Sequence, residues 1–144
     1  MKGERMRTRR SWAAAIAVVT AAGTLAGCGF TGVSVPELDG ERTEEDIPTA
    51  EFEILTEHAG DDVTVGYAGT EGDWTIYVAR IEPTPGYCIL MSENGEPGFS
   101  ACTFSLPLST KPADEDFTVV FGGGRYGTLP DGAERISDSV FITR

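Results

Sequence analysis

Short runs of β-branched and aromatic residues recur through the second half of the chain, separated by clusters of glycine, proline and aspartate. Runs of this kind, spaced about 10 to 15 residues apart, are typical of antiparallel strands joined by turns. The predicted strands cover residues 63–67, 74–81, 87–91, 100–104, 117–121 and 139–143. The pattern therefore predicts an all-β fold, a small antiparallel sandwich or partly open barrel of about six or seven strands.

Two stretches add detail to this pattern. Residues 74–81 are apolar on both faces after the first positions, as expected of a central strand. Residues 52–60 fit two structures, because Phe52 and Ile54 alternate as in a strand, whereas Thr49 and Gly60 would suit the two ends of a short helix. We expect a strand there.

Two cysteines flank a predicted turn. Cys88 and Cys102 each lie seven residues from Gly95, so a hairpin turning at residues 93–96 would place the two thiols opposite each other. Asn94 and Gly95 both tolerate the positive φ angles of a tight turn. We therefore predict a Cys88–Cys102 disulfide. Two buried free thiols are the alternative, and a redox or metal pair is disfavoured because C-x-x-C spacing and histidine partners are missing.

Residues 1–28 have the pattern of a targeting segment rather than of a folded domain. Residues 1–10 carry five basic side chains and one acidic one, and residues 12–26 carry no charge. The uncharged run is shorter than the roughly 18 apolar residues that a membrane-spanning helix needs. It ends at Leu25, Ala26, Gly27 and Cys28. These four residues resemble the lipobox of bacterial lipoprotein precursors.

The resemblance implies that Cys28 receives a diacylglyceryl group and that residues 1–27 are removed as a signal peptide. The protein would then be held at the extracytoplasmic face of the cell membrane by the lipid on Cys28. An uncleaved N-terminal anchor is the alternative. Arg9 and Arg10 also faintly resemble a twin-arginine export signal.

Two further segments follow the predicted cleavage site. Residues 28–50 are acidic and poor in apolar side chains, which predicts a disordered tether. Docking of this stretch through Val33, Val35 and Leu38 is the alternative. Residues 51–144 are then expected to form the single β domain.

Composition agrees with an exported protein. If the lipid takes one of the three cysteines, the other two form an even pair in an oxidising compartment. From residue 28 onward the chain has 6 Lys and Arg against 22 Asp and Glu, a formal charge of −16. Such a surface would repel nucleic acid, so we expect no nucleic-acid partner.

A looser resemblance involves the C-terminal half. A tryptophan-containing strand, Tyr87-Cys88, a second cysteine, residues 127–132 and a closing run at 139–141 are similar to uncharacterised small actinobacterial secreted or lipid-anchored proteins. This resemblance implies an extracytoplasmic domain and assigns no site residues.

No motif nominates a catalytic residue, a cofactor or a metal site. Residues 122–127 satisfy G-x-G-x-x-G, but too little chain follows for a dinucleotide-binding βαβ unit. Residues 98–102 fall short of the hydrolase motif G-x-S-x-G and lead into a strand. His58, the only histidine, is expected in an exposed turn. The acidic residues at 61–62, 114–116 and 131 lack EF-hand spacing. We expect them to lie in charged turns that keep the surface soluble, rather than to form a calcium site.

These observations together favour a lipid-anchored, non-catalytic binding or interaction module at the cell envelope. Such a module is expected to expose an apolar or aromatic patch. One alternative is a small hydrolase, which would need two carboxylates converging in a cleft about 5 to 10 Å apart. The other is a passive structural lipoprotein with neither a patch nor a pocket.

The lipid anchor yields the first testable prediction. Replacing the sulfur nucleophile with Cys28→Ala removes the only atom in the motif that can form the thioether to lipid, so membrane retention should be lost or processing should fail. Fractionation of the expressing cells, with immunoblotting of membrane and soluble fractions, measures this. Unchanged membrane retention of the variant would refute lipidation at Cys28.

Overall fold

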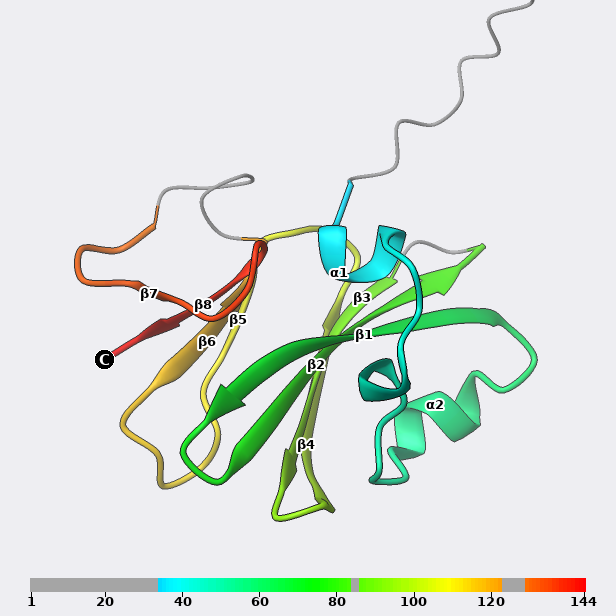
Figure 1. Cartoon of the computed structure of the whole chain (residues 1–144), viewed down its shortest axis with the longest axis horizontal. Helices are drawn as coiled ribbons and strands as arrows, with labels where there is room; N and C mark the ends of the chain where they lie inside the picture. The colour runs from blue at the N-terminus through cyan, green and yellow to red at the C-terminus, as the bar shows by residue number, and fades with distance from the viewer. Residues whose placement is uncertain (1–33, 84–85, 123–128) are drawn as a thin grey trace, which may run out of the picture. The chain divides into compact units, whose positions relative to one another are not determined.

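Two four-stranded antiparallel sheets form the architecture, with strand orders β1-β2-β3-β4 and β5-β6-β8-β7 (Figure 1). The structure, a computed structural model, describes residues 34–83, 86–122 and 129–144. The first sheet contains β1 (Asp62–Glu71), β2 (Trp74–Glu82), β3 (Gly86–Glu93) and β4 (Glu96–Thr103). The second contains β5 (Leu108–Thr110), β6 (Thr118–Phe121), β7 (Glu134–Arg135) and β8 (Val140–Thr143). Between residue 34 and β1 lie three short helical segments, namely α1 (Pro36–Asp39), the 3-10 helix η1 (Glu44–Asp46) and α2 (Glu53–Glu57).

The all-β prediction is confirmed, and all six predicted strand ranges coincide with strands. Two separate sheets make the fold a sandwich rather than a barrel. The described residues contain eight strands instead of six or seven, because β5 and β7 were not predicted. They contain three and two residues, too few to show an alternating pattern in the sequence.

The main core lies between the two sheets. Alternate residues of β2 and β3 face it, and alternate residues of β6 and β8 meet them from the other side. The fully buried side chains of this layer include Ile76, Val78, Ile89, Met91, Val119, Phe121, Val140 and Ile142. Because these residues follow the two-residue period of a strand, each strand contributes one complete face to the core.

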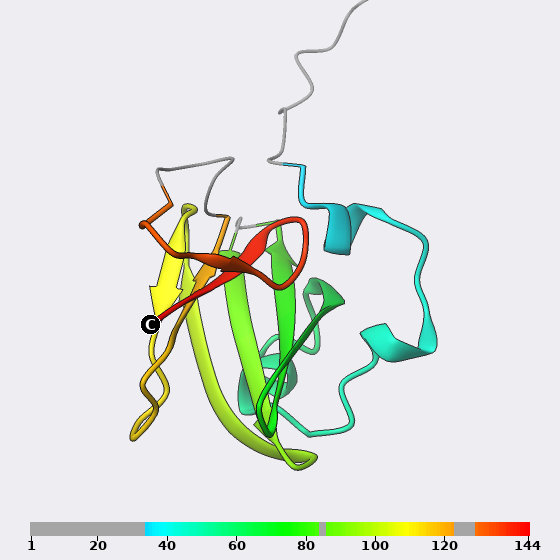
Figure 2. The same ribbon diagram turned by 60° about the vertical axis from the view of Figure 1, so that its left-hand side comes forward.

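The opposite face of the first sheet is apolar as well. Tyr77, Ala79, Ile81, Cys88 and Leu90 form a second buried cluster there. Residues of the N-terminal segment, including α2, cover this cluster. Figure 2 shows the resulting order of layers, with the second sheet, the first sheet and the N-terminal segment arranged side by side.

The β3–β4 hairpin contains the predicted disulfide, with Cys88 opposite Cys102 and a Cα–Cα distance of 4.1 Å. The two-residue loop consists of Asn94 and Gly95, with φ angles of 50° and 86°. A turn centred between these residues would place Cys88 opposite residue 101. One extra residue in β4, Gly98, shifts the register between Met91 and Ser92 and so brings the cysteines together.

Gly98 is required at this bulge for a second reason. A Cβ atom there would lie 2.5 Å from the ring of Trp74, so only glycine allows the tryptophan to pack across the hairpin. The Trp74 indole N–H donates to Glu115 at 2.8 Å, which connects the first sheet to the loop between β5 and β6.

The prediction of a disordered tether is wrong for residues 34–50, which we call the N-terminal strap. Val35 and Leu38 are buried in the core between the sheets. A Cβ atom on Gly66 would lie 2.1 Å from the carbonyl oxygen of Glu37, so α1 packs directly onto the backbone of β1. The described domain therefore begins before residue 51. Cys28 and Val33 lie outside the described residues.

The strap has few apolar side chains, and two of its carboxylates attach it to the sheets through hydrogen bonds. Glu37 accepts hydrogen bonds from the backbone N–H of Ser139 at 2.9 Å and from its hydroxyl at 2.6 Å, and it also contacts the Ser137 hydroxyl. Asp46, only 9% exposed, accepts from the backbone N–H groups of Thr43 at 2.7 Å and Tyr67 at 2.8 Å. The strap is thus held to both sheets by long-range polar contacts.

The prediction of a strand at residues 52–60 is also wrong. Residues 53–57 form α2, and His58 follows at its end. Ile54 and Leu55 are adjacent, and both pack against the second buried cluster beside Phe52. A strand would direct two adjacent side chains to opposite faces, whereas a helical turn keeps both on the sheet.

The buried carboxylate of Asp46 produces a pH-dependent contribution to stability. Burial alone would raise the pKa of Asp46, but the hydrogen bonds from Tyr67 and Thr43 outweigh it and hold this pKa below its ordinary value. A group whose pKa is lowered by folding stabilises the native state above its unfolded-state pKa, about 4, and loses that contribution as the pH falls through the folded-state pKa.

We therefore predict that Asp46→Asn lowers the free energy of unfolding by about 1.5 to 3 kcal/mol at pH 7, because charge-assisted hydrogen bonds are lost. The difference between the variant and the wild type should shrink as the pH falls from 5 to 3. Urea unfolding at both pH values measures this. Asp138→Asn is the matched control, since the Asp138 carboxylate is exposed and its ion pair with Arg135, at 3.4 Å, lies at the surface. A constant difference across this pH range would contradict the assignment.

Candidate functional site

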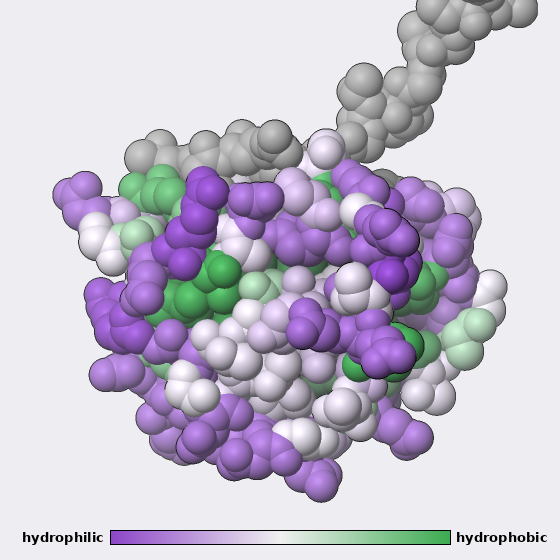
Figure 3. Space-filling view, in the orientation of Figure 1, coloured by the Kyte–Doolittle hydropathy of each residue, from purple (hydrophilic) through white to green (hydrophobic). Residues whose placement is uncertain are grey.

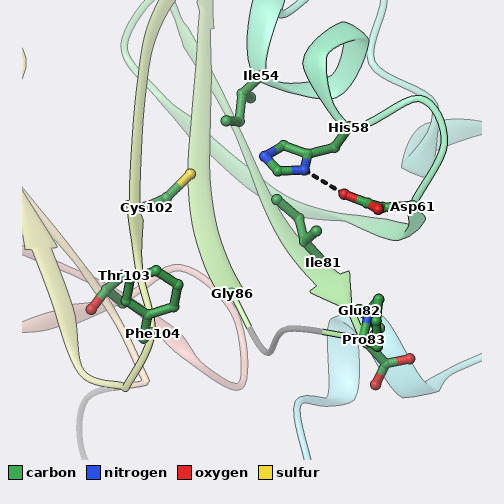
Figure 4. A pocket seen from close by; sticks show the side chains of 10 residues that line it. All are labelled: Ile54, His58, Asp61, Ile81, Glu82, Pro83, Gly86, Cys102, Thr103 and Phe104. Carbon is green, nitrogen blue, oxygen red and sulfur yellow. Dashed lines mark hydrogen bonds and ion pairs between the residues drawn. The ribbon is translucent and has the colours of Figure 1, made fainter.

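A cavity of about 540 Å³ lies where α2 faces the ends of β2 and β4 (Figure 4). Its walls come from four places in the chain: α2 and the turn after it, the end of β2, the start of β3, and the end of β4. The lining residues are Ile54, His58, Asp61, Ile81, Glu82, Pro83, Gly86, Cys102, Thr103 and Phe104. The cavity exists because α2 covers only part of the apolar outer face of the first sheet.

Apolar groups dominate the walls of this cavity. Ile54 and Ile81 belong to the second buried cluster or pack against it, so the floor of the cavity continues the hydrophobic layer under α2. Phe104 stands on the rim and is 78% exposed. Its phenyl ring extends the apolar lining of the cavity to the molecular surface.

A histidine and an aspartate form the polar part of the rim. His58 follows the last turn of α2, and its Nδ1 atom lies 2.6 Å from Oδ2 of Asp61. Figure 4 shows both side chains at the wall nearest to α2. His58, expected in an exposed turn, is 36% exposed by its side chain, and its ring is oriented by Asp61.

The pair lacks a nucleophile among the described lining residues. The Thr103 hydroxyl donates to the carbonyl oxygen of Ser105 at 3.0 Å, and the Cys102 sulfur is committed to the disulfide. A hydrolytic triad requires a hydroxyl or thiol within hydrogen-bond reach of the histidine. The geometry is that of a hydrogen-bonding rim.

Two carboxylates line the cavity, but they do not converge. Asp61 is bound to His58, and Glu82 lies 3.8 Å from Nε of Arg80 and is about half exposed. Figure 4 shows the Glu82 carboxylate directed away from the His58–Asp61 pair. The arrangement gives no support to the paired-carboxylate hydrolase considered from the sequence.

The remaining acidic turns have structural roles or face solvent. Asp114 adopts a positive φ of 65°, and the neighbouring Glu115 accepts the hydrogen bond from Trp74. Within residues 34–83, 86–122 and 129–144, no three His, Cys, Asp or Glu side chains are close enough to hold a metal ion. On the face drawn in Figure 3, hydrophilic residues predominate and hydrophobic ones form small separate patches.

Of the two glycine-containing motifs in the sequence, one lies in a strand and the other lies largely outside the described residues. Residues 98–102 belong to β4, so the near-match to G-x-S-x-G is a strand and not a strand-to-helix turn. The predicted glycine-rich loop at 122–127 lies, apart from Gly122, outside the described residues, as does Cys28. Over the described ranges, no helix has the length and hydropathy needed to cross a membrane.

Sequence reasoning placed Cys88 and Cys102 together but missed the cavity itself. The available signal was the apolar character of both faces of β2, which requires a cover on each side of the first sheet. Assigning residues 52–60 to a strand removed the helix that provides the second cover. Without α2, nothing placed His58 and Ile54 opposite Cys102.

Comparison with protein families, with characterised proteins and with solved structures yields no significant match.

Proposed function

We propose that the chain is a lipid-anchored extracytoplasmic binding module and that the cavity between α2 and the end of β4 receives an apolar group of its ligand. The single observation that carries the proposal is this cavity of about 540 Å³, with the 78% exposed ring of Phe104 on its rim. A hollow of this size is in the range that small ligands and anchoring side chains occupy.

The anchoring part of the proposal rests on the sequence. The basic start, the uncharged run and the four residues ending at Cys28 support export and lipid attachment. A disulfide between Cys88 and Cys102 is in keeping with an oxidising compartment. The lipid would hold the cavity close to the cell surface, where it meets envelope components.

The binding part of the proposal rests on how the cavity is built. The disulfide and the β3–β4 ladder fix one wall, and the buried cluster under α2 fixes the floor. A preformed apolar hollow loses little conformational entropy on binding, which favours recognition. The His58–Asp61 pair supplies one polar group at the rim that can orient the ligand.

The cavity yields a direct binding prediction. Nile red, a neutral apolar dye, should bind the chain from residue 28 carrying Cys28→Ser, with a rise in fluorescence and about one dye per chain. Phe104→Ala should weaken this binding about tenfold, since about 1.4 kcal/mol of apolar contact is lost. A fluorescence titration provides the dissociation constant.

Ile47→Ala is the matched control, because Ile47 is 66% exposed and does not line the cavity. Its dissociation constant should equal that of the wild type. If Ile47→Ala weakens binding as much as Phe104→Ala, the dye binds exposed apolar surface in general and the cavity is not the site.

A further inference from the structure

One edge of the first sheet has no ladder partner among the described strands. β4 is the last strand in the order β1-β2-β3-β4 and, among the described strands, pairs only with β3. A strand in this position leaves one row of backbone N–H and C=O groups without a ladder partner. These groups form a template on which a further strand can add.

The cysteine pair determines which backbone groups point outward. Directly opposed residues of an antiparallel ladder alternate between hydrogen-bonded pairs, about 5.5 Å apart at Cα, and non-hydrogen-bonded pairs, about 4.5 Å apart. Cys88 and Cys102 are 4.1 Å apart at Cα and therefore form a non-hydrogen-bonded pair. The N–H and C=O of Cys102 thus point away from β3, and those of Ser100, two residues earlier, do the same.

The two halves of this edge differ in how they are protected. The first half contains Glu96, Pro97 and the Gly98 bulge, all of which obstruct the addition of another strand. From Phe99 to Thr103 the register with β3 is regular, and no residue from 97 to 110 is charged. The second half lacks the charged side chains and prolines that usually guard an edge.

The unguarded half ends at the cavity. Cys102 and Thr103 both line it, and Phe104 follows on the rim. A strand added along β4 would place one of its residues directly opposite Cys102, with its side chain on the same face of the sheet as the cysteine. That side chain would therefore point into the hollow under α2.

Charge selects the kind of occupant. The chain from residue 28 has a formal charge of −16, and the carboxylates of Asp61 and Glu82 border the cavity. A second copy of the chain would bring two strongly acidic surfaces together, which electrostatic repulsion opposes. A segment with lysine or arginine beside its apolar residues would instead be attracted.

We infer that the open edge of β4 from Phe99 to Thr103 binds an extended, basic peptide segment of a partner protein as an additional strand. The backbone of Ser100 and Cys102 provides its hydrogen bonds, and the side chain opposite Cys102 fills the cavity. The inference rests on the proposed function, because the cavity is where the apolar side chain of the peptide lies.

The test begins with a random twelve-residue peptide library displayed on phage and selected on the chain from residue 28 carrying Cys28→Ser. Selected peptides should alternate apolar and other residues and be enriched in lysine and arginine.

The best peptide is then synthesised, and its dissociation constant is measured for Ser100→Pro and for the control Ser100→Ala. Ser100→Pro removes an outward N–H without removing a hydrogen bond to β3, so it should weaken binding at least tenfold. Ser100→Ala should bind as the wild type does.

A second measurement uses the unchanged protein. N-methylation of the synthetic peptide at alternate residues blocks one edge of an added strand, so one of the two methylation frames should abolish binding and the other should preserve it. Equal affinity of both frames, equal affinity for Ser100→Pro and the wild type, or selection of no peptide would overturn the inference. A dimer that dissociates in Ser100→Pro would also overturn it, since the occupant would then be a second copy. In each case, binding of Nile red by the wild-type cavity would leave the proposed function standing. If the wild-type chain did not bind Nile red, the proposed function and the strand-addition inference would both be overturned.

Discussion

The Cys88–Cys102 pair is the constraint on which the rest of the structure depends. It fixes the register of the β3–β4 hairpin across the Gly98 bulge, where a slip of one residue would reverse every side chain of β4. In the chain-entropy account, closing a loop of about 15 residues contributes about 3 kcal/mol, a large share of the stability of a small domain. Cys102 of the same pair lines the cavity, and its backbone N–H and C=O point away from β3.

The outer face of the first sheet explains why the N-terminal strap and α2 are part of the fold. Both faces of the sheet are apolar, and the second sheet covers only one of them. The strap has few apolar side chains, so Glu37 and Asp46 attach it through hydrogen bonds to distant backbone groups. Burial alone would raise the pKa of Glu37, but the hydrogen bonds from Ser137 and Ser139 hold it below its ordinary value. The cavity remains where this cover ends.

Much of the β-structure follows from the sequence, because strand periodicity is local. The recurring runs of β-branched and aromatic residues predicted six strands, and the spacing of Cys88 and Cys102 about Gly95 predicted the disulfide. The strap was not predictable in this way, since its acidic composition indicates disorder, whereas its stability comes from contacts with residues far along the chain, such as Tyr67. The α2 segment was ambiguous, because five residues fit both periods, and the buried layer beneath it decided the outcome. The cavity depends on α2 and was missed with it.

Amide hydrogen exchange measured by NMR on the free protein tests most directly whether the outer edge of β4 is open beside the apolar cavity. We predict that the N–H groups of Ala101 and Thr103, which face β3, are protected by the ladder. The N–H groups of Ser100 and Cys102 should exchange at least about tenfold faster, because they face solvent. Equal protection of all four amides would show that this edge is already covered and would contradict the account.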